Sequence, residues 1–166
     1  RLEPYKEKGQ FLPFAQLMHL FEEYPVLVGC GHPFRAPGHV PELPEEQLRR
    51  LGFLDLNGKD LALDRVRTEA QTYALARWLN IPVVSGSDTH QAVQYGCVTT
   101  VFERECRSIS ALKAEMNAGR YEIVLSDTAA AQVRTACLLK RSLKEIHALG
   151  GDYVSILTKE AAECVS

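Results

Sequence analysis

An aspartate and a histidine two residues apart follow a short β-branched run, and these residue types can hold a metal ion or move a proton. The run begins at Ile81 and Pro82 and ends in small residues before Asp88 and His90. In an extended segment, residues i and i+2 point to the same side. The spacing therefore predicts that a carboxylate and an imidazole leave one buried strand in the same direction, as a divalent metal site or an acid–base site requires. The alternative is a turn, in which Asp88 caps a helix and His90 is a surface residue.

Strand-like and helix-like segments alternate along the chain, which predicts βαβ units and a parallel sheet. The apolar spacing of 63–79 predicts the clearest helix, with Asp64 as its cap and an apolar core stripe that includes Tyr73 and Trp78. The other helices are expected at 14–24, 45–51, 111–118 and 129–149, and the strands at 26–31, 53–57, in the run before Asp88, at 98–102 and at 121–125.

Polar residues follow three of the predicted strands. They are His32 after the first, Asn57 at the end of the second, and the Asp88 and His90 pair after the third. Because chemistry in parallel α/β folds gathers at the carboxyl ends of strands, these side chains are expected to converge. Asn57 is expected to hydrogen-bond a substrate or another site residue, whereas Asp55 is expected to face away from the site or to hold the neighbouring loop.

The composition argues against several classes of protein. With 166 residues, 46% of them hydrophobic, and a formal net charge of −2, the chain suits one globular unit, or part of one, without the basic excess of a nucleic-acid-binding surface. No apolar run is long enough to span a membrane. Five cysteines without a Cys-x-x-Cys pair favour a reducing, cytoplasmic location over a disulfide framework. A nucleophilic Cys30 beside His32 is the alternative to metal chemistry.

Three segments resemble the PHP (polymerase and histidinol phosphatase) family. Residues 28–35 resemble its strand followed by a His-Pro motif, and residues 54–58 resemble the next strand, which ends in Asn. Residues 85–90 resemble the closing Gly-Ser-Asp-x-His motif, and a short loop with Gly96 follows. The segments occur in the family's order, and the resemblance extends over about residues 20–125.

This resemblance implies part of a distorted (β/α)7 TIM-like barrel with mostly parallel strands and a cluster of two or three divalent metal ions at the strand ends. It implies that His32, Asp88 and His90 are metal ligands, that Asp88 and His90 also form the catalytic part, and that Arg35 lies near the substrate phosphate. Alternatively, Arg35 holds its own loop by an ion pair. A mixed histidine and carboxylate set suits Zn²⁺, Mn²⁺ or Fe²⁺.

The function implied is that of a metal-dependent phosphoesterase, which hydrolyses a phosphate ester with metal-activated water. The expected substrate is a phosphorylated small molecule or a nucleotide. Two other functions stay open, namely a non-catalytic half-domain that binds a partner, and an amidohydrolase-like metal hydrolase whose closing aspartate acts as a base.

The sequence lacks counterparts of the family's amino-terminal His-x-His motif, of the histidine that follows it and of the bridging glutamate. The chain is therefore expected to be the C-terminal half of such a domain, with 1–127 as the barrel part and 128–166 as a helical extension packed on it. Alone, this half would bind metal weakly and hydrolyse little. The strand edges of an open barrel are expected to be covered by the missing half or by a second copy of the chain.

Overall fold

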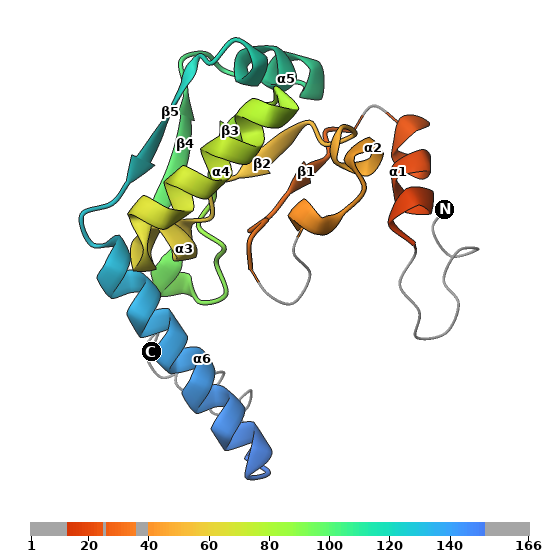
Figure 1. Cartoon of the computed structure of the whole chain (residues 1–166). Helices are drawn as coiled ribbons and strands as arrows, with labels where there is room; N and C mark the ends of the chain where they lie inside the picture. Colours follow the sequence, from red (N-terminus) through yellow and green to blue (C-terminus); the bar gives the residue numbers. More distant parts are fainter. Residues whose placement is uncertain (1–12, 25, 36–39, 152–166) are drawn as a thin grey trace.

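The computed structural model describes residues 13–24, 26–35 and 40–151 and has helices and strands in alternation (Figure 1). The elements are α1 (Phe14–Glu22), β1 (Gly29–Cys30), the 3-10 turn η2 (Val40–Glu42), α2 (Glu45–Leu48), β2 (Phe53–Asp55), α3 (Gly58–Leu63), α4 (Arg65–Leu79), β3 (Val83–Val84), the 3-10 turn η3 (Ala92–Gln94), β4 (Val98–Phe102), α5 (Ile109–Asn117), β5 (Tyr121–Leu125) and α6 (Ala129–Ala148).

A three-stranded parallel sheet in the order β1–β2–β3 forms the centre of the molecule. Cys30 pairs with Leu54, and Leu54 pairs with Val83, so the three strands end at the same edge. The prediction of an α/β fold with parallel strands is confirmed for these three strands. Over the described residues they form an open sheet and not a closed barrel.

The last two strands differ from the expected parallel arrangement. β4 and β5 pair with each other in antiparallel fashion, from Val98 opposite Leu125 to Phe102 opposite Tyr121. Covered and exposed residues alternate along both strands, which is typical of an antiparallel pair with one face toward solvent. Both strands were predicted, but the prediction of a parallel sheet is wrong for this pair.

The buried face of α4 is not the apolar stripe that the sequence suggested. Trp78 is 50% exposed and Val66 is 80% exposed, whereas Thr72 and Ala76 are buried. Trp78 instead lies 5.6 Å from the guanidinium of Arg49, outside the core. The prediction that Tyr73 and Trp78 belong to the core is therefore wrong.

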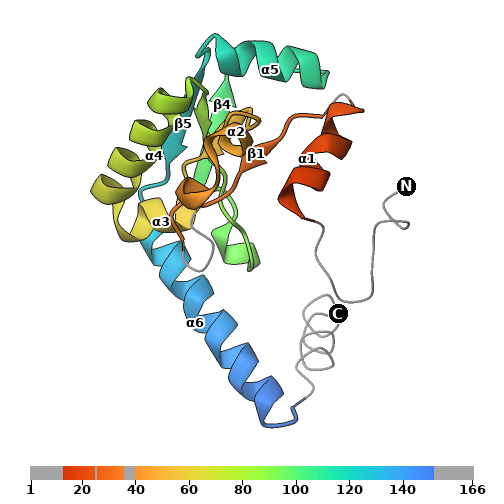
Figure 2. The ribbon, with the colours of Figure 1, turned by 45° about the vertical axis from the view of Figure 1, so that its right-hand side comes forward.

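The longest helix, α6, runs away from the two sheets in both views (Figures 1 and 2). Its first turns pack on the body through Ala129, Val133 and Ala136, which are buried. No helix in the described ranges is both long and apolar enough to cross a bilayer. The division of the chain at residues 127 and 128 stays a prediction, and residues 152–166 lie outside the described part.

Gly58, the first residue of α3, is closely packed between two strand ends. A Cβ atom added there would collide with the side chain of Val98 and would lie 2.9 Å from the carbonyl oxygen of Gly86. We expect Gly58→Ala to lower the free energy of unfolding by about 2 kcal/mol, because neither neighbour can move without disturbing the core. Urea denaturation measures this change. Gly86→Ala is the matched control, since its added Cβ meets no described heavy atom within 4 Å; equal losses in both variants would contradict the packing argument.

Candidate functional site

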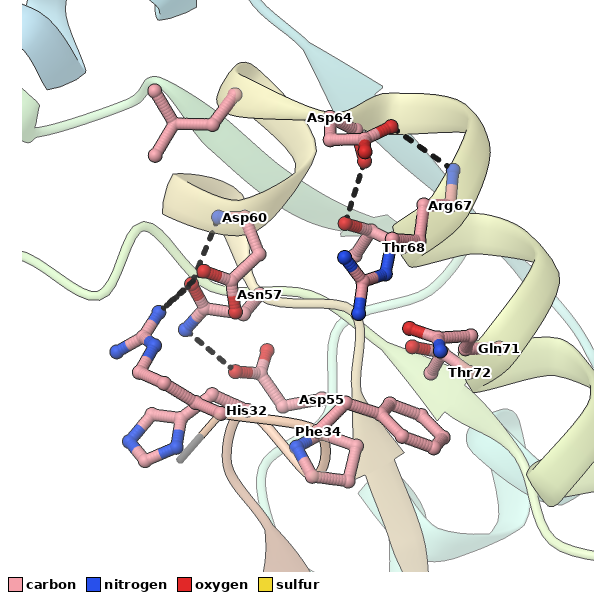
Figure 3. Close-up of a pocket in the computed structure, with 13 residues that line it drawn as sticks. His32, Phe34, Asp55, Asn57, Asp60, Asp64, Arg67, Thr68, Gln71 and Thr72 are labelled. Carbon is pink, nitrogen blue, oxygen red and sulfur yellow. Dashed lines mark hydrogen bonds and ion pairs between the residues drawn. The ribbon is translucent and has the colours of Figure 1, made fainter. Parts of the chain in front are cut away.

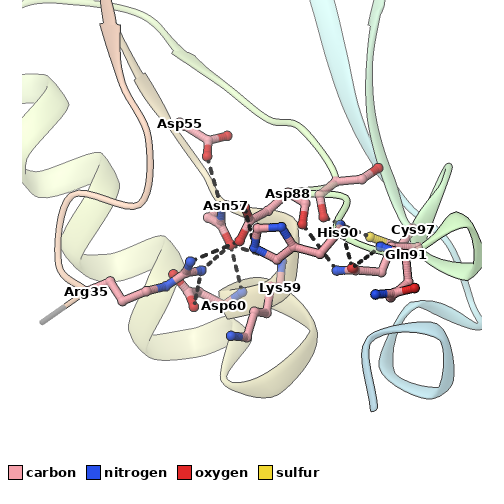
Figure 4. A network of polar contacts seen from close by, with 11 residues as sticks. Arg35, Asp55, Asn57, Lys59, Asp60, Asp88, His90, Gln91 and Cys97 are labelled. Atoms are coloured by element: carbon pink, nitrogen blue, oxygen red, sulfur yellow. Dashed lines mark hydrogen bonds and ion pairs between the residues drawn. The ribbon is translucent and has the colours of Figure 1, made fainter. Parts of the chain in front are cut away.

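Arg35 joins the three strand ends through side-chain contacts. One terminal nitrogen, Nη1, donates to Oδ2 of Asp88 at 2.9 Å, and the other, Nη2, donates to Oδ1 of Asn57 at 2.8 Å and to Oδ1 of Asp60 at 2.9 Å (Figure 4). These partners come from the segment after β3, the end of β2 and the first turn of α3. Arg35 thus bridges separate elements, and its ion pairs with Asp60 and Asp88 agree with the alternative in which it holds its own loop. That Arg35 lies near a substrate phosphate stays a prediction.

Asn57 is the hydrogen-bonding centre of this network and is 2% exposed. Its Oδ1 accepts the backbone N–H groups of Lys59 and Asp60 as the cap of α3, besides the Arg35 bond, and its Nδ2 donates to Oδ2 of Asp55 at 3.2 Å. An Asn before a Gly-Lys-Asp segment is an N-cap pattern, and a short helix that was not among the predicted ones begins there. All of these hydrogen-bond partners of Asn57 are other groups of the protein.

Asp55 lies in the cavity wall, so of its two predicted arrangements the one in which it faces away is wrong, and the one in which it holds the neighbouring loop is confirmed by its bond to Gly86. Its Oδ1 accepts the backbone N–H of Gly86 at 3.1 Å, and its Oδ2 accepts from Asn57. Residues i and i+2 of an extended segment share a side, and this rule places Asp55 with Asn57. Burial raises the pKa of Asp55, and hydrogen bonds from Asn57 and from the backbone of Gly86 and His32 offset only part of that rise.

Asp88 and His90 do lie close together, but not for the reason that the sequence suggested. Asp88 has a φ of 50°, in the left-handed region, so the segment after β3 is not extended through Asp88, and the rule that residues i and i+2 share a side does not apply there. Oδ1 of Asp88 nevertheless lies 3.9 Å from Nε2 of His90. Burial alone would raise the pKa of Asp88, but the hydrogen bond and charge of Arg35 outweigh it, with smaller contributions from Asn57 and His90, and hold that pKa below its usual range.

Asp88 and His90 fit part of a metal-binding set. Oδ2 of Asp88 is bound to Arg35, while Oδ1 faces the imidazole of His90, so one oxygen and one nitrogen are directed to the same place. Over the described ranges, no three His, Cys, Asp or Glu side chains come together as a group that could hold a metal ion. His32 therefore does not join Asp88 and His90 in one ligand group, although it lines the neighbouring cavity.

A cavity of about 230 Å³ lies on one side of Arg35, between the loop after β1 and the first turns of α4 (Figure 3). His32, Arg35 and Asn57 belong to its wall, and Phe34 adds an aromatic surface. Asp88 is not part of the wall but contacts it through Arg35. Several polar wall residues were missed by sequence reasoning, and only their proximity in sequence to the Asn57 and Asp64 caps could have indicated them. They are Asp60, Arg67, Thr68, Gln71 and Thr72.

Cys30 is a buried core residue and a poor nucleophile. Burial, together with the charge of Asp55, raises the pKa of its thiol to about 11, so the reactive thiolate is scarce near neutral pH. The described cysteines Cys30, Cys97, Cys106 and Cys137 are free thiols, and Cys164 lies outside the described residues. The alternative of a nucleophilic Cys30 is therefore disfavoured.

Comparison with known proteins relates part of the chain to one family. Residues 68–121 match the family model PHP_C, described as PHP-associated. This match confirms the predicted resemblance of the chain to a PHP-domain C-terminal region. No curated protein is similar to the chain in sequence.

Among solved structures, the fold is similar to that of PsfC from Pseudomonas syringae PB-5123, with a TM-score of 0.64 and 19% sequence identity. The similarity covers 83% of this chain and 55% of the PsfC chain, so this chain spans little more than half of the PsfC length. At this identity the likeness shows a common fold.

Proposed function

We propose that this chain carries part of the site of a metal-dependent phosphoesterase related to the PHP family. In this proposal Arg35 binds the phosphate of the substrate, and Asp88 and His90 hold a divalent ion. His32, in the wall of the neighbouring cavity, is a ligand of a different ion. The observation that carries the proposal is the Arg35 guanidinium, which lies between the cavity and the Asp88 and His90 pair.

The chemistry of the donor atoms supports this assignment. An imidazole nitrogen and a carboxylate oxygen suit Zn²⁺, Mn²⁺ or Fe²⁺. A bound ion of this kind would supply an activated water and would polarise a phosphoryl oxygen. Arg35 is a suitable phosphate ligand because its guanidinium is permanently charged and directs several N–H donors at oxyanions.

The remaining residues of the network keep Arg35 in position. Asn57 fixes Arg35 through Oδ1, and its Nδ2 restrains Asp55 on the opposite side. Asn57 thereby acts on a substrate through Arg35, which binds the phosphate directly. We assign the cavity beside Arg35 to the alcohol part of the ester, which belongs to a phosphorylated small molecule or a nucleotide.

The proposal extends to the setting of the site. We propose that the open sheet is part of a distorted (β/α)7 barrel, and that the barrel is completed by another segment or by a second copy of the chain. We also propose a cytoplasmic location, because free cysteines are stable in a reducing compartment.

The test is hydrolysis of p-nitrophenyl phosphate by the full-length gene product with added Mn²⁺. We expect Asp88→Asn to lower turnover by about 100-fold, because it weakens both the metal site and the bond to Arg35. Asp127→Asn removes an exposed carboxylate outside the network and is expected to leave turnover unchanged. Full turnover in Asp88→Asn and in His90→Ala would overturn the proposed role of this pair, and the absence of turnover in the wild type would favour a non-catalytic module.

A further inference from the structure

The two terminal nitrogens of Arg35 are not equally occupied. Nη1 has one protein partner, Oδ2 of Asp88, whereas Nη2 has two, Oδ1 of Asn57 and Oδ1 of Asp60. The Nη2 partners belong to the same short helix, since Asn57 caps α3 and Asp60 lies in its first turn. The guanidinium is thus held firmly from one side and by a single bond from the other.

An oxyanion that approaches Arg35 is expected to exchange with a protein partner. Exchange on the Nη1 side breaks one bond, to Asp88, whose other oxygen already faces His90 at 3.9 Å. Exchange on the Nη2 side would break two bonds and would leave Asn57, which is buried, without its charged donor. Because unpaired buried polar groups are costly, the Nη1 side is the one that opens.

Asp60 is well placed to keep Arg35 in position during this exchange. Its backbone N–H is bound to Oδ1 of Asn57 at 3.2 Å, which fixes the start of its side chain relative to the cap. Its carboxylate is partly covered, and among the described residues Arg35 is its ion-pair partner. Once Asp88 is displaced, Asp60 supplies the remaining negative charge beside the guanidinium.

We infer that Asp60 is a positioning residue, which holds Arg35 in place while a phosphoryl oxygen of the substrate replaces Asp88 at Nη1. This inference rests on the proposed function, since it assumes that Arg35 binds phosphate. Asp60 touches neither the substrate nor the reacting atoms and acts through Arg35.

Removing Asp60 is expected to change phosphate binding in opposite directions for two possible roles of this residue. Asp60 is a carboxylate close to a proposed anion site, so electrostatics alone predict that its removal strengthens phosphate binding. A positioning role predicts that removal of Asp60 weakens phosphate binding, because a guanidinium without this ion pair must be ordered again before it binds phosphate. The direction of the change therefore distinguishes the two roles.

The experiment measures the binding of inorganic phosphate to the full chain by isothermal titration calorimetry. We expect Asp60→Asn and Asp60→Ala to weaken binding by about fivefold or more, because each weakens or removes one charge-assisted bond to Arg35. Asp60→Glu keeps the charge and is expected to recover part of the affinity. Asp64→Asn is the matched control, because Asp64 lies in the same cavity wall and caps α4, whereas the described Arg35 side chain is bound to other residues. Asn is an equally good cap.

A second readout follows Arg35 itself. In the nitrogen-15 spectrum, the Nε–H signal of Arg35 is expected to shift and to exchange faster with water in Asp60→Asn but not in Asp64→Asn. Unchanged or tighter phosphate binding in Asp60→Asn would overturn the inference while leaving the phosphate site intact. Binding that survives Arg35→Met would overturn the proposed role of Arg35 instead. If the wild type binds no phosphate, the proposed phosphate binding by Arg35 is wrong. In that case an unaltered Arg35 signal in Asp60→Asn would also overturn the positioning of Arg35 by Asp60.

Discussion

Replacing Arg35 with methionine is expected to lower the free energy of unfolding by about 2 kcal/mol, because it leaves Asp60 and Asp88 without their cation. Methionine keeps much of the apolar stem, so the change isolates the guanidinium. The loss of a fully buried pair costs about 3–5 kcal/mol. We expect less here because 26% of the Arg35 side chain is exposed and solvent screens the pair.

Urea denaturation of Arg35→Met and Arg67→Met gives the measurement and its control. The Arg67 side chain lines the same cavity but has no hydrogen-bond or ion-pair partner among the described residues. Its removal is expected to change the free energy of unfolding by less than about 0.5 kcal/mol. Equal effects of the two substitutions would show that Arg35 contributes only as a cavity wall.

The dependence of this difference on pH tests the ion pair itself. The pKa of Asp88 is lower in the folded chain than its ordinary value, despite burial, because of the hydrogen bond and charge of Arg35. The stabilisation is therefore complete above the ordinary aspartate pKa of about 3.9 and is lost as the pH falls through the folded value. The stabilities of wild type and Arg35→Met should accordingly converge below about pH 4, and a difference that persists in acid would exclude the pair as its source.

Replacing Asn57 with alanine is expected to cost about 3 kcal/mol, the largest effect of a single substitution in this network. The loss of the α3 cap accounts for about 1 kcal/mol. The rest arises because the buried Asp55 loses a donor and Arg35 loses an acceptor, at about 1–3 kcal/mol.

Asn57→Ser separates these two contributions. Serine retains an oxygen that caps the helix but lacks the amide that reaches Asp55, so we expect it to recover about 1 kcal/mol of the loss. Amide hydrogen exchange at Lys59 and Asp60 gives a local readout, since both N–H groups are bound to Asn57. If serine and alanine both unfold at the wild-type urea concentration, Asn57 is not the centre of the site.

The sequence by itself determined the elements whose signals are local. The helix at α4 was predicted with its Asp64 cap, and a helix was predicted at 111–118, where α5 lies. Helix caps and helix ends depend on neighbouring residues, so a few consecutive residues of the sequence are sufficient to identify them. The order of strand ends also predicted that His32, Asn57 and the Asp88 and His90 pair would converge at one edge of a parallel sheet. It did not predict that Arg35 would join Asn57 to Asp88 there.

The tertiary structure decided which faces and partners those elements have. Burial of α4 on its Thr72 and Ala76 side, and the antiparallel direction of β4 and β5, depend on contacts between distant segments that local periodicity does not contain. The pairing of Arg35 with Asp60 and Asp88 joins residues 25 and 53 positions apart. Such a network depends on folding, which brings the cation and the carboxylates together at a partly buried edge of the sheet. Because burial of an unpaired charge costs free energy, the charged side chains at this edge must pair with one another.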